Sequence, residues 1–212
     1  MDRASHLGQR GLMFDARLRP LIDPPLNAAG RALAAMGVSA NALTLAGLLI
    51  GLGAAFAAAH GQFLAALAFI LANRVLDGLD GAVARVRGPS ALGGYFDIVA
   101  DFAFYVSIPV GFGIYASENT LPALVLTASF VLTGVSFLAF AVIAAERGET
   151  TEAHGSKSFF YSTGLAEGAE TIAVFAAMCL FPHWFGVIAY GYAALCALTV
   201  IQRSALAIRT FR

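Results

Sequence analysis

Charged residues are scarce in this chain. They make up 12% of its 212 residues, whereas hydrophobic residues make up 59%. A soluble domain usually carries roughly 25% charged residues, so an ordinary water-exposed surface is excluded. Basic and acidic residues balance at 13 each, and a net charge of zero gives no general attraction for nucleic acid. The composition indicates a membrane protein with no nucleic-acid partner.

Cysteine is almost absent as well. Cys179 and Cys196 lie in apolar stretches and form neither a metal-binding spacing nor a disulfide framework, so we interpret them as packing residues. Arg3 and Arg10 stand near the N-terminus without an apolar segment behind them. We therefore expect no cleavable signal peptide.

Long apolar runs are what the chain has instead. A membrane-spanning helix needs roughly 20 predominantly apolar residues, and six segments predict such spans. The fifth of them is short and would need the polar residues before it. The predicted fold class is all-α integral membrane, with six transmembrane helices in one domain over residues 1–212. The six predicted spans are Leu43–Ala59, Phe63–Arg85, Gly93–Tyr115, Leu121–Ala145, Ala169–Phe181 and Trp184–Leu206.

The positive charges predict an orientation. All 13 arginine and lysine residues lie before the first span, in or near the end of the second, between the fourth and fifth, or from the end of the sixth (Arg203) onward. The connections around His60, Ser117–Thr120 and Pro182–His183 contain none. Because short loops rich in lysine and arginine stay in the cytoplasm, we expect both termini to be cytoplasmic.

A short helix is predicted before the first span. Asp23 is followed by two prolines, which is a good helix start, and apolar residues recur at helical spacing over Leu26–Met36. We expect an amphipathic helix along the cytoplasmic interface within residues 1–38, ahead of a six-helix bundle over 39–212. An ordinary linker is the alternative.

Four aspartates gather at the cytoplasmic ends of the second and third spans. Asp80 is three positions after Asp77, and Asp101 is four positions after Asp97, so each pair shares one helix face. The connection Val86–Leu92 is short, and we expect the two helices to be antiparallel neighbours. Carboxylates inside a membrane are costly unless neutralised. Oxygen ligands alone suit hard cations such as Mg²⁺, Mn²⁺ or Ca²⁺.

The same helix face also offers space and an arginine. Gly81 and Ala84 allow a flat group or a backbone to approach, and Gly93 adds room on the next helix. Arg85 presents a planar fork that matches phosphate oxygens. A metal, a phosphate-binding arginine and room for a base together indicate a nucleotide diphosphate site.

The full pattern is Asp77-x2-Asp80-Gly81-x2-Ala84-Arg85-x7-Gly93-x3-Asp97-x3-Asp101. It resembles, position for position, the signature of the CDP-alcohol phosphotransferase (CDP-alcohol phosphatidyltransferase) family. That resemblance implies six membrane helices and a juxtamembrane helix. The stretches Lys157–Tyr161 and Gly164–Thr171 resemble a bacterial inner-membrane branch of the family. The implied location is the bacterial inner (cytoplasmic) membrane, with the active site facing the cytoplasm.

The resemblance also implies a role for each motif residue. Asp77, Asp80 and Asp97 would hold two Mg²⁺ or Mn²⁺ ions, with Ca²⁺ as another candidate occupant. Asp101 would contribute to the metal site and act as general base. Gly81, Ala84 and Gly93 would line the cytidine pocket, and Arg85 would bind phosphate. Asn41 and Thr44 match a weaker sequence element of the family at the first span, which also contacts the nucleotide.

Several residues keep two interpretations. Asn41 and Thr44 could instead cap the first span. Lys157 could contact a phosphorylated acceptor or be a surface charge. Glu167 and Glu170 could line an acceptor pocket or lie at the interface.

The implied reaction belongs to phospholipid biosynthesis. CDP-diacylglycerol would give its phosphatidyl group to a small alcohol, glycerol phosphate by default, and release CMP. The family resemblance further implies a homodimer among membrane lipids. One alternative is a CDP-polar-alcohol donor with diacylglycerol as acceptor. Another is a metal or proton transporter that uses the intramembrane aspartates.

Overall fold

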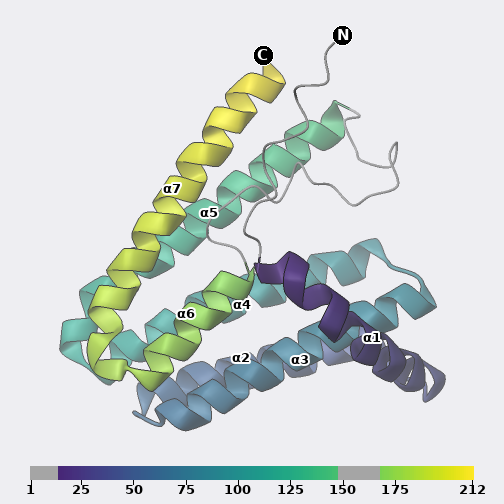
Figure 1. Cartoon of the computed structure of the whole chain (residues 1–212), viewed down its shortest axis with the longest axis horizontal. Helices are drawn as coiled ribbons and strands as arrows, with labels where there is room; N and C mark the ends of the chain where they lie inside the picture. Colours follow the sequence, from purple (N-terminus) through teal and green to yellow (C-terminus); the bar gives the residue numbers. More distant parts are fainter. Residues whose placement is uncertain (1–13, 148–167) are drawn as a thin grey trace.

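The chain folds into helices (Figure 1). The computed structural model describes residues 14–147 and 168–212, and this part of the chain contains no β-strand. The all-α prediction is thereby confirmed. The helices are α1 (Phe14–Ala35), α2 (Ala40–Ala59), α3 (Phe63–Arg87), α4 (Ala91–Tyr115), α5 (Thr120–Glu146), α6 (Gly168–Leu180) and α7 (Phe185–Phe211), with 3-10 turns η1 (Ser117–Asn119) and η3 (Pro182–Trp184).

Helices α2 to α7 occupy the six segments predicted as membrane spans. Four helical stretches are long and apolar enough to cross a membrane by length and composition: α2, α4, Ser117–Glu146 and Pro182–Phe211. Helix α3 is long enough, but its second half carries aspartates and arginines. Helix α6 is apolar but has 13 residues. The structure therefore provides four candidate spans within the described residues.

Helix α1 starts earlier than predicted. Asp23-Pro24-Pro25 lies inside a helix of 22 residues that begins at Phe14, so the prediction that these residues start the helix is wrong. Proline removes a hydrogen bond but its φ fits a helix, so the pair weakens the helix without ending it. Past the prolines, Leu26 lies against Gly78 of α3, and Gly30 lies against Ala82. One face of α1 is thus packed on α3.

Helix α2 is the element against which α3 and α4 both pack. Ser39 caps its first turn by accepting a hydrogen bond from the backbone N–H of Ala42. Most of its buried residues are small, so neighbouring helices approach closely. At Gly51, the nearest side chains are Phe104 from α4 and Asn73 from α3. Small residues thus let α2 pack closely against two neighbouring helices.

Helices α3 and α4 are antiparallel neighbours, as predicted. Both pack closely on α2, and they meet each other through long side chains: Phe63 stacks on Phe112, and Arg74 bonds to Asp101. The connection between them is only Gly88–Ser90, and Gly88 has a φ of 94°. A connection this short returns α4 antiparallel to α3, and α2 supports the acid-bearing helices from one side.

The other half of the molecule is the pair α5 and α7, which run side by side (Figure 1). Helix α4 joins the halves by packing on both α2 and α5, and α6 packs on α3 and α7. Buried aromatic rings fill the junction. The ring of Phe112 stacks on Phe185 with centroids 4.7 Å apart and on Phe63 at 5.3 Å. Aromatic packing therefore fixes α4 between the halves.

The close approach of α4 to α2 yields a stability prediction. A Cβ at Gly111 would collide with the carbonyl oxygen of Ala55, and a backbone atom cannot swing away. We expect Gly111→Ala to cost about 1–3 kcal/mol of stability, because the helices must separate. The control is Gly191→Ala on α7, where a Cβ meets nothing within 4 Å; alanine there should be neutral or stabilising by up to about 1 kcal/mol. Thermal unfolding in detergent compares them, and equal melting temperatures would contradict the α2–α4 packing.

Candidate active site

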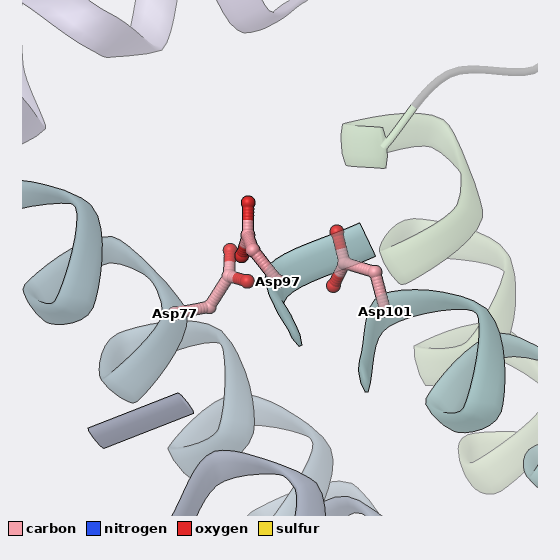
Figure 2. A group of neighbouring side chains, drawn as sticks. All are labelled: Asp77, Asp97 and Asp101. Carbon is pink, nitrogen blue, oxygen red and sulfur yellow. The ribbon is translucent and has the colours of Figure 1, made fainter. Parts of the chain in front are cut away.

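Three carboxylates meet between α3 and α4. Asp77 comes from α3, and Asp97 and Asp101 come from α4; each offers an oxygen, and these oxygens lie within 4.8 Å of one another. Figure 2 shows the three side chains reaching toward one space from the two helices. Oxygens bound to one Mg²⁺, Mn²⁺ or Ca²⁺ lie roughly 3–5 Å apart, because the bonds are about 2.0–2.6 Å long. The group therefore fits a hard divalent cation.

Asp80 lines the same cleft but has a different partner. Its side chain is buried, and its Oδ2 accepts a hydrogen bond of 2.7 Å from the hydroxyl of Thr44 on α2. Asp80 is not part of the three-carboxylate group, whose members are one turn away or on α4. Ser39, not Thr44, caps α2, and the hydroxyl of Thr44 instead ties α2 to the acidic face of α3.

Arg74 is the side chain in this cleft that the sequence reasoning missed. Its Nη2 donates to Oδ1 of Asp101 at 2.9 Å, and its Nη1 lies 3.5 Å from Oδ2 of Asp77. In the sequence, Arg74 is one of the 13 basic residues and indicated only the orientation of the spans. A signal was present, since Arg74 precedes Asp77 by three residues and so shares its helix face. What the sequence did not show was contact with Asp101 on another helix.

Asn41 at the start of α2 and Gly93 at the start of α4 lie together. A Cβ on Gly93 would be 3.3 Å from Oδ1 of Asn41 and 3.0 Å from Oγ of Ser90. Ser90 caps α4 by accepting from the backbone N–H of Gly93. The N-terminal ends of α2 and α4 thus meet at Gly93, where any larger residue would press on Asn41.

Arg85 lies farther from the acids, near α1. Its side chain is exposed, and its Nη2 donates to Oδ1 of Asn27 at 2.9 Å. Its Nη1 would be 3.4 Å from a Cβ on Gly81, and Ala84 is half-buried. Asn27 was not expected at the site from the sequence. Helix α1 therefore contributes a side chain that holds Arg85.

Two of the residues considered for an acceptor pocket lie outside the described residues. These are Lys157 and Glu167, both within 148–167. Glu170 is in the first turn of α6 and is half-buried. A Cβ on Gly168, at the start of α6, would lie 3.7 Å from the hydroxyl of Tyr105, which in turn contacts Arg74. The start of α6 therefore lies next to the acid cleft.

Comparison with known proteins settles the family. A model of the CDP-alcohol phosphatidyltransferase family matches residues 37–202, a range that includes all four aspartates. The chain belongs to the CDP-alcohol phosphatidyltransferase family. The resemblance inferred from the aspartate pattern is confirmed, and the protein is an enzyme of this family.

Two relatives are informative about this family member. It is 46% identical over 192 residues to the inner membrane protein YnjF of Escherichia coli, covering 90% of this chain and 93% of the relative. It is 37% identical over 98 residues to an archaetidylinositol phosphate synthase of Pyrococcus horikoshii, covering 45% of this chain and 52% of that one. The second match is limited to about half of each protein.

Solved structures share the fold. A phosphatidylinositol phosphate synthase of Mycobacterium tuberculosis with CDP-DAG bound has a TM-score of 0.63 at 22% identity, covering 85% of this chain and 92% of that one. The same synthase in complex with manganese and citrate has a TM-score of 0.62 at 20% identity, covering 85% and 88%. A protein with this fold has thus been crystallised with CDP-DAG and, separately, with manganese and citrate.

The hydrogen bond between Thr44 and Asp80 yields a prediction. Thr44→Val removes the donor and leaves a buried carboxylate oxygen without it, which should cost about 1–3 kcal/mol. Thr44→Ser keeps a hydroxyl at the same place and should lose much less. Both variants are compared with the parent by thermal unfolding in detergent with a metal chelator present. Equal melting temperatures for valine and serine would show that the hydrogen bond does not hold α2 to α3.

Proposed function

We propose that this enzyme transfers a phosphatidyl group from CDP-diacylglycerol to a small alcohol and releases CMP. The observation that carries the proposal is the convergence of carboxylate oxygens from Asp77, Asp97 and Asp101 within 4.8 Å. Membership of the CDP-alcohol phosphatidyltransferase family supports the donor class, and the CDP-DAG complex of the mycobacterial synthase supports the diacylglycerol part.

Asp77, Asp80 and Asp97 are the proposed metal ligands, with Asp101 contributing. Mg²⁺ or Mn²⁺ in a two-metal site is proposed, and Ca²⁺ is a candidate occupant; the manganese complex of the mycobacterial synthase supports a metal of this class. Bound metal would neutralise charge on the donor phosphates as CMP departs. The hydrogen bond from Thr44 to Oδ2 of Asp80 still leaves this carboxylate lone pairs for a metal, because each of its oxygens carries two.

Asp101 is proposed as the general base. It takes the proton from the acceptor hydroxyl while that oxygen forms a bond to the phosphorus that bears diacylglycerol. The bond between this phosphorus and the oxygen bridging to CMP breaks, and CMP leaves with the electron pair. The products are a phosphatidyl alcohol and CMP. The position of Asp101 one turn from Asp97 supports a base beside the metal ligands.

Donor recognition is proposed for the cytoplasmic ends of α2, α3 and α4. Gly81, Ala84 and Gly93 would line the cytidine pocket, and Arg85 would bind phosphate. The exposure of Arg85 supports this role, since its fork keeps donors in addition to the one given to Asn27. The remaining proposed nucleotide contacts are Asn41 and Thr44, at the start of α2.

The acceptor is proposed to be a small alcohol, and glycerol phosphate is the first to test. Uncharged polyols and serine belong in the same panel. Inositol phosphate is added because two similar proteins are inositol phosphate lipid synthases by name. Lys157 would contact a phosphorylated acceptor. The arrangement with a CDP-polar-alcohol donor and diacylglycerol acceptor is tested by the same lipid analysis.

We also propose a multi-pass topology in the bacterial inner membrane. The proposed protein has six spans and forms a homodimer. Both termini and the active site lie on the cytoplasmic side in this proposal. The E. coli relative is an inner membrane protein by name, which supports the membrane. The absence of arginine and lysine from the His60 and Pro182–His183 connections supports the orientation.

An activity assay tests the proposed function. Purified protein receives CDP-diacylglycerol, Mn²⁺ or Mg²⁺ and a panel of alcohols, and CMP release is measured. Asp101→Asn should lower metal-dependent CMP release by at least about 100-fold, because asparagine cannot take the proton. Asp23→Asn changes an exposed aspartate on α1 and serves as the matched control, with activity near that of the parent.

The same assay separates the enzyme from the competing transporter. Mass analysis of the new lipid identifies the acceptor and shows which substrate carried the lipid. If the parent neither binds CDP-diacylglycerol or CMP nor releases CMP under any metal, the proposed function is wrong. Metal-dependent proton or cation flux in vesicles, without CMP release, would favour the transporter.

A further inference from the structure

Arg74 is enclosed by contacts from two helices. Its Nη2 donates to Asp101 at 2.9 Å, its Nη1 lies 3.5 Å from Asp77 and 3.4 Å from the hydroxyl of Tyr105, and its side chain is 18% exposed. The guanidinium carbon lies 4.7 Å from the centre of the Phe104 ring. Arginine packed in this way can move little, because its fork and its flat face are both occupied.

The guanidinium of Arg74 is also held by Asn73, the residue before it in α3. Its Nε donates at 2.7 Å to Oδ1 of Asn73, and the amide of Asn73 donates at 2.8 Å to the carbonyl oxygen of Gly47 on α2. Asn73 is 3% exposed, so both of its hydrogen bonds are within the protein. The chain of contacts from Gly47 through Asn73 and Arg74 to Asp101 therefore joins α2, α3 and α4.

The two contacts to carboxylates differ in strength. The contact to Asp101 has the length of a good charge-assisted hydrogen bond, whereas the contact to Asp77 is longer than such bonds usually are. Asp97 has no contact with Arg74 among the described hydrogen bonds and ion pairs, and it is exposed. Arg74 thus ties one oxygen of Asp101 firmly, touches Asp77 weakly and leaves Asp97 to other partners.

We propose that Arg74 is a positioning residue for Asp101 and the counter-cation of the acid group until metal binds. It holds Asp101 by Oδ1, so that Oδ2 is the oxygen left for the metal or for the acceptor hydroxyl. A divalent cation takes over Asp77 from the weaker contact, while the contact to Asp101 stays. The kinetic part of this inference rests on the proposed function; the metal-binding part does not.

Two substitutions separate the charge of Arg74 from its shape. Arg74→Gln removes the positive charge, so Mn²⁺ meets less repulsion and no competing cation at Asp77 and Asp101. Arg74→Lys keeps the charge but offers a point donor in place of a planar fork that reaches Asp101 and Asn73 together. The matched control is Arg209→Gln, which alters an exposed arginine in the last turn of α7.

The experiment measures metal binding and turnover separately. Mn²⁺ alone is titrated into each purified protein, and free Mn²⁺ is followed by electron paramagnetic resonance. Arg74→Gln should bind Mn²⁺ roughly tenfold more tightly than the parent, and Arg74→Lys about as tightly. In the CMP assay, kcat should fall by roughly 100-fold in both, with KM for CDP-diacylglycerol near that of the parent, because Asp101 is no longer aimed. Arg209→Gln should change neither quantity.

A purely structural role for Arg74 predicts the opposite metal result. If Arg74→Gln keeps a single sharp melting transition but binds Mn²⁺ more weakly, or if kcat is unchanged in both variants, the inference is wrong. If the glutamine variant does not fold, the lysine variant decides, since parent-like Mn²⁺ binding with low kcat is expected only from positioning. A parent that releases no CMP overturns the proposed function alone, and the Mn²⁺ titration still decides whether Arg74 is the counter-cation.

Discussion

Mutual repulsion among neighbouring carboxylates is the constraint on which this structure depends. Three carboxylate oxygens lie within 4.8 Å of one another in a bundle of apolar helices. Like charges at that separation, partly shielded from water, destabilise the fold unless cations and hydrogen-bond donors oppose them. The donors here are the guanidinium of Arg74 on α3, which reaches Asp101 on α4, and the hydroxyl of Thr44 on α2, which reaches Asp80. Arg74 and Thr44 therefore offset part of the repulsion among the four aspartates.

Helix α2 is what makes that arrangement possible. Its small buried residues let α3 and α4 pack on it together, and Gly51 is the point where side chains from both helices meet. The backbones of α3 and α4 stand apart on α2, and long side chains such as Arg74 bridge them. The carboxylates of Asp77, Asp97 and Asp101 therefore face one space between the two helices.

The site also divides into two regions, one with the motif residues and one beside Arg74 and α6. At the C-terminal end of α3 and the N-terminal end of α4 lie the motif residues Gly81, Arg85 and Gly93, and Asn27 holds Arg85. Near the acids also lie Arg74, Tyr105 and the start of α6. Under the proposed function, the first region would bind CDP, and the second is where the acceptor alcohol would meet Asp101.

The sequence by itself determined the class of protein, the helical segments and the acid motif. Low charge and long apolar runs require helices that satisfy their own backbone hydrogen bonds, and the aspartate spacing places each pair on one helix face. These are local properties, so periodicity and composition were enough. The family followed from residues at fixed separations between Asp77 and Asp101.

Only the tertiary structure decided how these pieces meet. The sequence predicted α3 beside α4, but it did not predict that α2 holds both, because packing of small residues between distant segments leaves no periodic signal. Likewise, Asn27 reaches Arg85 across 58 positions and Arg74 reaches Asp101 across 27. A contact between side chains on different helices depends on crossing geometry, which spacing along one helix does not encode. For that reason Arg74 looked like a marker of orientation in the sequence and is part of the acid site in the fold.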